Sequence, residues 1–427
     1  MPLTNKQQFT WSRVRDSLWF IPAVVTLLTT ALAIAAVGVD RLEWLNPLME
    51  AHWALHSGPE GARVVLSTIA ASLMTVTGVV FSITIVALQL ASTQFSPRVL
   101  GEFLADRGIQ FVLGIFIGTF TYALIVLRAV RSDDGGTEVF VPSFAVSLSM
   151  LLVIVSIGAL IFMINHAARA IQVAVIMGRV RRYTMDDIEA AFPEPVGEPA
   201  QGVQAEPTVP DAPPATIEAR KAGYLQMVDE DALFAGAEGR RITIRMEPHV
   251  GDFVHSGEVM VSVWPPSAAD DELRQSVLRA FVIGSERTPE QDVEYGFIEL
   301  SDIAVKALSP GINDPSTAMS CIDWLGELLV VLGNRAVPQR VRTGEDGELR
   351  FISRRPSFDR AVGLAFDQIR HYGVSNPSLA RKLLNTIGRV AALVPEDRRK
   401  PLMEQAEAIR REAQHAVENA GELHSIE

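Results

Sequence analysis

The sequence predicts an α-helical membrane protein with four transmembrane helices, joined to a cytosolic α+β region that holds a small β-module and a helical bundle. Long apolar runs dominate residues 1–165, whereas residues 185–427 have the charge content of a soluble protein. A proline-rich segment lies near the start of the second part. The mean hydropathy of +0.21 therefore averages two different populations of residues.

Four stretches without charge are long enough to cross a bilayer, which takes about 20 apolar residues. They are Leu18–Val37, Val64–Leu90, Ile109–Leu127 and Val141–Ile164. The first resembles the apolar core of a signal peptide. It is longer than such a core and three more stretches follow it, so we expect it to be retained.

Basic residues predict the orientation, because loops that stay in the cytoplasm are rich in Lys and Arg. They precede the first span and follow the fourth: Lys6, Arg13, Arg15, Arg169, Arg179, Arg181 and Arg182. We therefore expect a multi-pass membrane protein with both termini cytoplasmic. The one cysteine, Cys321, suits a reducing compartment, and its apolar neighbours predict a buried structural residue.

The second span carries a stripe of uncharged polar residues. Thr68, Thr75, Ser82, Gln89 and Ser96 recur every seven residues, and Ser72 and Thr93 fall on the same side. Such side chains can hydrogen-bond to neighbouring helices, at about 0.6 kcal/mol each. They can also line a pore, where hydroxyls replace part of the hydration shell of an ion. Both interpretations stay open, and the pore-lining candidates are Thr68, Ser72, Thr75, Ser82, Gln89 and Thr93.

The four spans contain no ionisable side chain. Proton-coupled carriers usually need one inside the membrane, so the sequence argues against a proton-driven transporter. In the third span, Gly114 and Gly118 have the spacing that lets two helices approach closely.

The composition predicts five segments. They are a transmembrane domain (1–165), a helical extension (166–191), a proline-rich linker (192–216), a small β-module (217–268) and a helical cytosolic domain (269–427). The linker region places seven prolines among the 24 residues FPEPVGEPAQGVQAEPTVPDAPPA and shows no hydrophobic period. Residues 357–420 are amphipathic, with Leu402, Ala406, Ile409, Ala413 and Val417 on one helical face.

The β-module contains two runs rich in β-branched residues, ITIRM and EVMVSVW, with the turn HVGDFVHSG between them. It resembles the small β-sandwich of biotinyl and lipoyl carriers. The carrier lysine on its hairpin is missing, so the resemblance implies no swinging cofactor, and no cofactor is expected.

Residues 297–308 have helical spacing, and SPGINDP then ends the helix. Gly311 tolerates a positive φ, Asp314 is a candidate N-cap and Pro315 suits the first helical position, so a second helix is predicted over Ser316–Leu332. Three motifs, ERTPEQD, ALSPGINDPSTA and TGVVFSITIVALQLASTQFSPRV, resemble the bacterial family of predicted membrane proteins called domain of unknown function 2254. The resemblance reaches from the first span to about residue 400. It implies an integral membrane protein with a cytosolic tail, and it brings no activity or catalytic residue with it.

Polar residues of these motifs are candidates for binding a small molecule or ion: Glu286, Arg287, Asp292, Asp302, Lys306, Asn313 and Asp314. In the structural alternative, Arg287 and Lys306 pair with nearby carboxylates. Asn313 and Asp314 then only shape a turn and cap a helix.

Several function classes are disfavoured. The net charge of −12 argues against nucleic-acid binding, and the sequence shows no catalytic triad, transition-metal ligand cluster or nucleotide-binding signature, so an enzyme is not expected. The function we predict is a homo-oligomeric ion channel or passive permeation pathway in the lipid bilayer, lined by the second span and regulated by the cytosolic region. The alternative is a membrane-anchored sensory or protein-interaction module with no transport activity.

Overall fold

The computed structural model describes residues 17–42, 58–94, 106–132, 139–170, 172–192, 212–289, 291–336 and 341–424. These residues form two compact units. We call the described residues up to 175 the apolar unit and those from 176 onward the carboxy-terminal unit, and describe each by itself.

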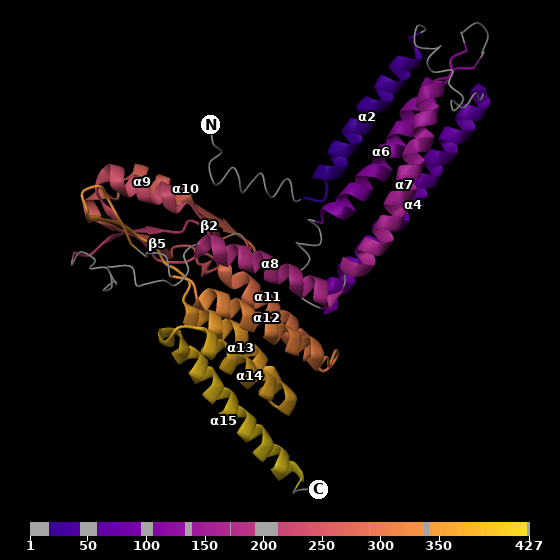
Figure 1. Cartoon of the computed structure of the whole chain (residues 1–427). Helices are drawn as coiled ribbons and strands as arrows, with labels where there is room; N and C mark the ends of the chain where they lie inside the picture. The colour runs from indigo at the N-terminus through magenta and orange to yellow at the C-terminus, as the bar shows by residue number, and fades with distance from the viewer. Residues whose placement is uncertain are drawn as a thin grey trace. The chain divides into compact units, whose positions relative to one another are not determined.

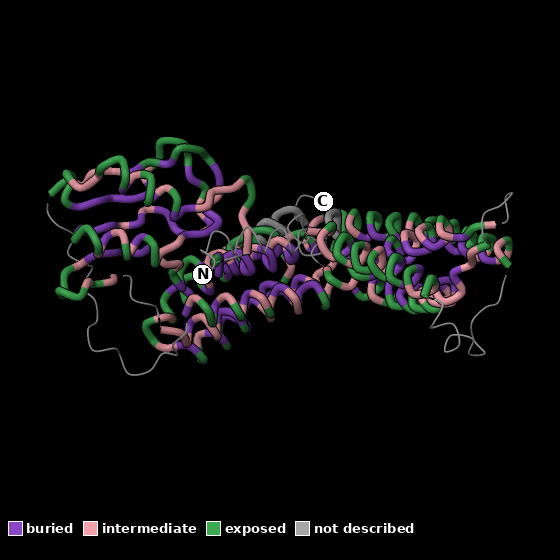
Figure 2. Tube along the Cα trace, turned by 90° about the horizontal axis from the view of Figure 1, so that it is seen from above, coloured by how far each residue is buried: buried purple, intermediate pink, exposed green. Residues whose placement is uncertain are grey.

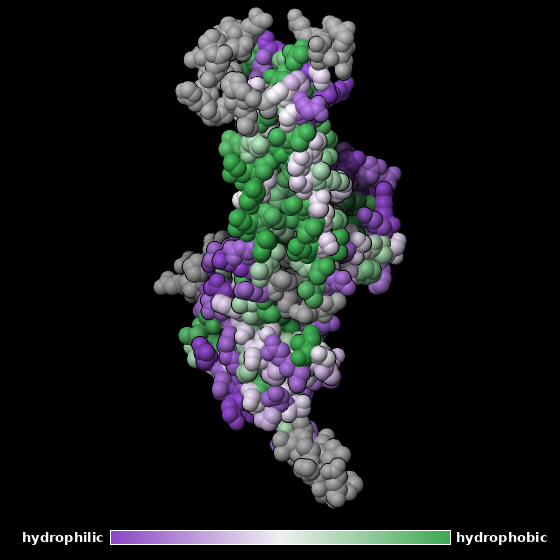
Figure 3. Space-filling view, turned by 90° about the vertical axis from the view of Figure 1, so that its right-hand side faces the viewer, coloured by the Kyte–Doolittle hydropathy of each residue, from purple (hydrophilic) through white to green (hydrophobic). Residues whose placement is uncertain are grey.

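The apolar unit contains four long helices, α2 (Phe20–Asp40), α4 (Pro59–Gln94), α6 (Arg107–Ala129) and α7 (Ser143–Ala170) (Figure 1). All four are long and apolar enough to cross a membrane. Hydrophobic residues form a broad continuous surface over this unit in the space-filling view (Figure 3). A fifth helix, α12 (Pro315–Gly333) of the carboxy-terminal unit, also meets these criteria, so length and composition do not by themselves fix the number of spans at four.

Helix α6 is the most buried of the four: 61% of the residues in its apolar stretch are buried, against 22% for each of the other three helices. Its glycines face α2: a Cβ on Gly118 would lie 2.7 Å from Oγ1 of Thr29, and one on Gly114 would lie 3.0 Å from Cβ of Val25. The Gly pair therefore has the predicted effect and lets two helices approach closely.

Polar side chains tie the helix ends of this unit together. Asp40, at the end of α2, accepts hydrogen bonds at 3.0 Å from the backbone amides of Phe144 and Ala145 in the first turn of α7. Asp106 caps α6 and lies 2.9 Å from Nε2 of His166 near the end of α7. These contacts satisfy helix-terminal groups that would otherwise lack partners.

The carboxy-terminal unit contains two sheets. The first has the order β1-β5-β3-β8-β7, with strands Ala215–Glu218, Val259–Trp264, Thr243–Met246, Leu349–Ile352 and Val341–Thr343. The second has the order β4-β2-β6, with strands Phe253–Val254, Gly223–Val228 and Phe281–Gly284. The β3–β8 pairing is parallel, and the other pairings are antiparallel.

These sheets differ from the predicted β-module of residues 217–268. Strands β6, β7 and β8 come from the stretch expected to be helical, and helix α9 (Glu230–Arg240) interrupts the stretch expected to be strands. The region is therefore not the self-contained β-sandwich that the turn HVGDFVHSG predicted. The three unexpected strands have only three or four residues each, too few to show a period. β6 and β8 pair with strands distant in sequence, and β7 pairs with the neighbouring β8.

Most of the remaining chain of this unit is helical: α8 (Val173–Ala191), α10 (Asp271–Ala280), α11 (Val293–Ala307), α12, α13 (Phe358–Gly373), α14 (Pro377–Leu393) and α15 (Arg399–His424). The helical pattern expected to continue unbroken to about residue 191 is interrupted between α7 and α8. Buried residues line the inner faces of the helices (Figure 2). Leu402, Ala406 and Ile409 are buried and Ala413 is partly buried, as predicted for this face of α15, and the side chain of Val417 lies outside those described. Most of the predicted linker, residues 193–211, lies outside the described residues.

The SPGINDP turn was predicted correctly except at one residue. The side chain of Asp314 accepts a hydrogen bond from the amide of Thr317 at 3.1 Å, and Pro315 begins α12. The positive φ, however, falls on Asn313 (49°) and not on Gly311. Asn is among the few residues with a Cβ that adopt this conformation readily, because its short side chain can hydrogen-bond locally.

Helix α8 packs onto α11 and α12 within this unit. Thr184 of α8 fills the space beside Gly296 of α11, where a Cβ would clash with its hydroxyl. Nearer the start of α8, Sδ of Met177 lies 3.4 Å from Sγ of Cys321, which is fully buried as predicted.

Candidate functional site

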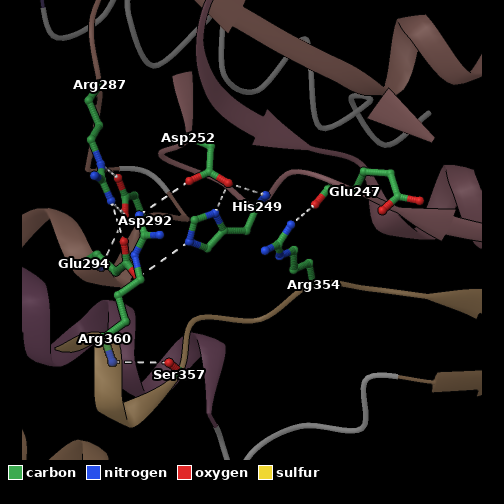
Figure 4. Close-up of polar contacts among 9 residues, drawn as sticks. All are labelled: Glu247, His249, Asp252, Arg287, Asp292, Glu294, Arg354, Ser357 and Arg360. Atoms are coloured by element: carbon green, nitrogen blue, oxygen red, sulfur yellow. Dashed lines mark hydrogen bonds and ion pairs between the residues drawn. The ribbon is translucent and has the colours of Figure 1, made fainter. Parts of the chain in front are cut away.

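A cluster of six charged side chains lies inside the carboxy-terminal unit (Figure 4). The turn between β3 and β4 supplies His249 and Asp252, and the segment after β6 supplies Arg287. The start of α11 supplies Asp292 and Glu294, and the first turn of α13 supplies Arg360. Four segments distant in sequence therefore converge here.

Arg287 is the centre of the most buried part of the cluster. Its Nη2 lies 2.9 Å from Oδ1 of Asp292 and 3.0 Å from Oε2 of Glu294, and its Nε also bonds to Asp292. The side chains of Asp292 and Glu294 are only 1% and 2% exposed. Carboxylates buried to this extent are stable as anions only when paired and hydrogen-bonded.

His249 lies between the carboxylates of Asp252 and Glu294. Its Nδ1 contacts Asp252, and its Nε2 lies 3.6 Å from Oε1 of Glu294. Burial by itself lowers the pKa of His249, but the bonds and charges of Asp252 and Glu294 outweigh it and raise that pKa to about 9. His249 is therefore protonated at neutral pH.

Arg360 completes the charge balance. Its Nε lies 2.8 Å from Oε1 of Glu294, and its Nη2 lies 3.4 Å from Oδ1 of Asp252. Three carboxylates then face three cations: Asp252, Asp292 and Glu294 against His249, Arg287 and Arg360. Arranged in this way, the cluster forms a neutral ion network.

The backbone around the cluster is specialised. Gly251 has a φ of +94°, and a Cβ there would meet the guanidinium of Arg287 and lie 2.6 Å from Oδ2 of Asp292. Gln291 also has a positive φ, 60°, and its Oε1 accepts a hydrogen bond from the amide of Val228 at 3.1 Å. The close approach at Gly251 explains why HVGD carries a glycine next to ERTPEQD in space.

A cavity of about 340 Å³ adjoins the cluster. His249, Asp292 and Glu294 form part of its lining, and α8, α9 and the segment 354–356 form other parts. Among the described residues, no group of three or more His, Cys, Asp or Glu is arranged to hold a metal ion.

The polar stripe on α4 faces away from the rest of the apolar unit. Thr68, Ser72, Thr75, Ser82 and Gln89 are all exposed. The buried side of α4 includes Leu66, Leu73, Val80 and Ala87. Each of these precedes a stripe residue by two positions, which is about 200° around a helix. These five described side chains of the stripe therefore lie on the face of α4 opposite its buried side.

A family model described as "Predicted membrane protein (DUF2254)" matches residues 15–389. The chain belongs to the DUF2254 family. It is a membrane protein in which several helices are apolar enough to cross a bilayer.

Relatives of this DUF2254 protein include an uncharacterized protein of Mycobacterium tuberculosis (strain CDC 1551 / Oshkosh) and one of Mycobacterium bovis (strain ATCC BAA-935 / AF2122/97). Both are 35% identical over 396 residues, which cover 91% of this chain and 74% of the relative. No solved structure matches the chain.

The structure separates the residues that the sequence proposed for ligand binding. Arg287 and Asp292 lie in the cluster, and Glu286 is exposed and accepts a hydrogen bond through its carbonyl from Gln226 at 2.6 Å. Asp302 lies further along α11 and lines a second cavity together with Arg360 of the cluster. Lys306 lies near the end of α11, and Asn313 and Asp314 lie in the SPGINDP turn. Asp314 there acts as the cap of α12.

Sequence reasoning missed His249, Asp252, Glu294 and Arg360. His249 and Asp252 were visible only as part of a turn motif, and Glu294 follows the ERTPEQD motif by two positions. Arg360 carries no local signal, because its position in a helix start does not reveal which residues it meets. Of the stripe residues, Thr93 has no described side chain and Ser96 lies outside the described residues.

Proposed function

We propose that this DUF2254 protein forms a homo-oligomeric ion channel or passive permeation pathway in the bacterial inner membrane, lined by α4. The observation that supports this is the outward direction of the polar stripe. The oxygens of these hydroxyl and amide groups can accept further hydrogen bonds, which lipid does not donate but water or a second copy of the chain does. A ring of copies that brings its stripes together would enclose a polar path without charges.

The hydroxyls of the stripe suit a permeation path. Thr68 and Thr75 donate to the backbone carbonyls of Val64 and Ala71 at 2.7 and 3.0 Å. Each hydroxyl hydrogen is then used within the helix, while the oxygen lone pairs remain able to coordinate a passing cation. Such a path requires no catalytic residues.

In this proposal α2, α4, α6 and α7 cross the membrane and α12 does not. Helix α12 carries Asp323, which pairs with Lys382 of α14 at 2.6 Å, and Trp324, which stacks under Arg181 of α8 at 5.0 Å. A Cβ on its Gly326 would lie 2.6 Å from Cγ2 of Thr386. These contacts pack α12 within the carboxy-terminal unit, which supports a count of four spans. Four spans would leave both termini on one side of the membrane, and the basic residues at the two ends favour the cytoplasmic side.

Cysteine accessibility tests the lining directly. Single cysteines at Thr75, Ser82 and Gln89 are expected to react with a small water-soluble thiol reagent in intact membranes. The matched controls Met74 and Phe81 precede two of these positions by one residue and are also exposed, at 61% and 47%. They should stay unlabelled, since they face lipid. Cys321 is fully buried, so the unmodified chain serves as the blank.

Ion flux in liposomes decides between the two functions. The purified protein should pass ions above background, and Ser82→Leu should reduce the flux while Phe81→Leu does not. Equal labelling of stripe and control positions, together with no flux at varied pH and voltage, would rule out the permeation pathway.

The second candidate is a membrane-anchored sensory or interaction module. It is favoured by the cavity beside the ion network, which is an arrangement typical of small-molecule sites. This candidate predicts ligand binding in a protein that conducts nothing.

A further inference from the structure

The cavity beside the ion network is built from parts that are distant in sequence but lie in one unit. Its walls come from α8, the start of α9, the β3–β4 turn, the start of α11 and the segment between β8 and α13. Its volume of about 340 Å³ is at the lower end of the range for small-molecule sites. An occupant would therefore be a small molecule and not a peptide.

Most charges in the lining already have partners of opposite sign. Glu230 pairs with Arg355 at 2.6 Å, and Asp231 pairs with Arg342 at 2.8 Å. Asp292 and Glu294 are neutralised by the ion network. Because these carboxylates are paired, the lining has little negative potential left to attract a further cation.

Two arginines of the lining retain hydrogen-bonding capacity. Arg354 donates to a neutral group, the carbonyl of Glu247, at 2.6 Å, and no carboxylate of the described residues pairs with it (Figure 4). Nε of Arg355 is buried and has no hydrogen-bond partner in the described part of the chain. A buried donor without a partner costs about 1–3 kcal/mol, so an acceptor at this place would be stabilising.

The rest of the lining is largely apolar. Val228, Met246, Val250, Val293 and Pro356 contribute to it. An inorganic anion would leave this surface unused, whereas an organic molecule would bury it.

We infer that the cavity binds a small organic anion, whose carboxylate or phosphate group accepts hydrogen bonds from Arg354 and Arg355 and whose apolar part packs against the valines, Met246 and Pro356. Arginine suits both groups, because its planar fork matches the oxygens of either. Asp187, which α8 contributes to the lining, opposes the anion and limits its affinity.

Occupancy of the cavity also affects α8. This helix lines the cavity with Asp187, Ala190 and Ala191. It begins three residues after α7 ends. A bound molecule would thus pack against the carboxy-terminal end of α8, the helix that follows the last helix of the apolar unit. Binding does not depend on the permeation proposal, since it is measured without flux.

The test uses full-length protein in detergent and measures thermal stability and direct binding by calorimetry. The probes are phenyl phosphate and benzoate. Benzyl alcohol tests the apolar part alone, phenyltrimethylammonium reverses the charge, and inorganic phosphate tests the anionic group alone. Phenyl phosphate or benzoate is expected to bind more tightly than the other three.

Substitutions locate the binding. Arg354→Gln should weaken it by about tenfold, as expected for a lost hydrogen bond to a charged group. Arg354→Lys should recover part of it, and Asp187→Asn should strengthen it. Arg381→Gln, at an exposed position of α14 outside the lining, should have no effect.

Hydrogen exchange supplies the second readout: the bound anion should slow exchange at the end of α8. The inference is overturned if neither anion binds, if phenyltrimethylammonium binds as well as they do, or if binding by Arg354→Gln equals that of the unmodified chain. Absence of ion flux in liposomes would leave these results unchanged.

Discussion

The α4 stripe and the ion network place polar groups in apolar surroundings in opposite ways. The network is charged and faces inward, and Asp292 and Glu294 find their partners within the chain. The stripe is uncharged, and its described side chains are exposed on the side of α4 opposite Leu66, Leu73, Val80 and Ala87. The carboxylates of the network find their partners within one chain, whereas the oxygens of the stripe can accept further hydrogen bonds from water or another copy.

The largest expected effect comes from breaking the network at its centre. Arg287→Ala leaves Asp292 and Glu294 buried without their main partner, which should cost about 3–5 kcal/mol in the free energy of unfolding. Urea unfolding of the protein in detergent, followed by tryptophan fluorescence, to which Trp264 and Trp324 of the carboxy-terminal unit contribute, measures it. The exposed Arg381→Ala is the control, and a cost below about 1 kcal/mol for Arg287→Ala would mean that the network contributes little.

The network should also make stability depend on pH. The pKa of His249 is raised from 6.5 to about 9 in the folded state, so protonation of His249 stabilises the fold. This stabilisation is fully present below pH 6.5 and is lost as the pH rises through about 9. The shift corresponds to about 3 kcal/mol. Unfolding measured between pH 6 and 10 should show the loss, and His249→Gln should flatten it; an unchanged slope would contradict the assignment.

Substitutions at two glycines can distinguish the cost of backbone strain from the cost of a steric clash. Gly251 and Gly257 have similar positive φ angles, +94° and +87°, but a Cβ meets the network only at Gly251 and finds no atom within 4 Å at Gly257. Gly257→Ala should cost about 1 kcal/mol from strain alone. Gly251→Ala should cost about 1–3 kcal/mol more because it displaces Arg287 and Asp292. Equal midpoints in thermal unfolding would show that the close approach is unimportant.

The smallest effect on stability is expected on the stripe. Ser82 is exposed and Thr84, two residues later, is buried on the opposite side of α4. Ser82→Leu should change the stability of a single chain by less than about 0.5 kcal/mol, and Thr84→Leu should destabilise it by about 1–3 kcal/mol. If Ser82→Leu shifts thermal unfolding as strongly as Thr84→Leu, the stripe packs inside the folded chain.

Local patterns predicted the apolar helices, the break at SPGINDP and the buried face of α15. Each depends on residues close together in sequence, as with Asp314 capping α12. The sheets were predicted poorly, because β3 pairs with β8 about one hundred residues away. Nothing in the spacing of ITIRM identifies that partner.

The sequence by itself determined the division into an apolar and a charged part, the membrane character and the family. Hydropathy and motifs are properties of neighbouring residues and need no fold to be read. Only the tertiary structure decided which polar residues meet. It brought His249 and Arg360 to the carboxylates of α11 and turned the α4 stripe outward. Both outcomes depend on packing between segments distant in sequence, which leaves no periodic trace along the chain.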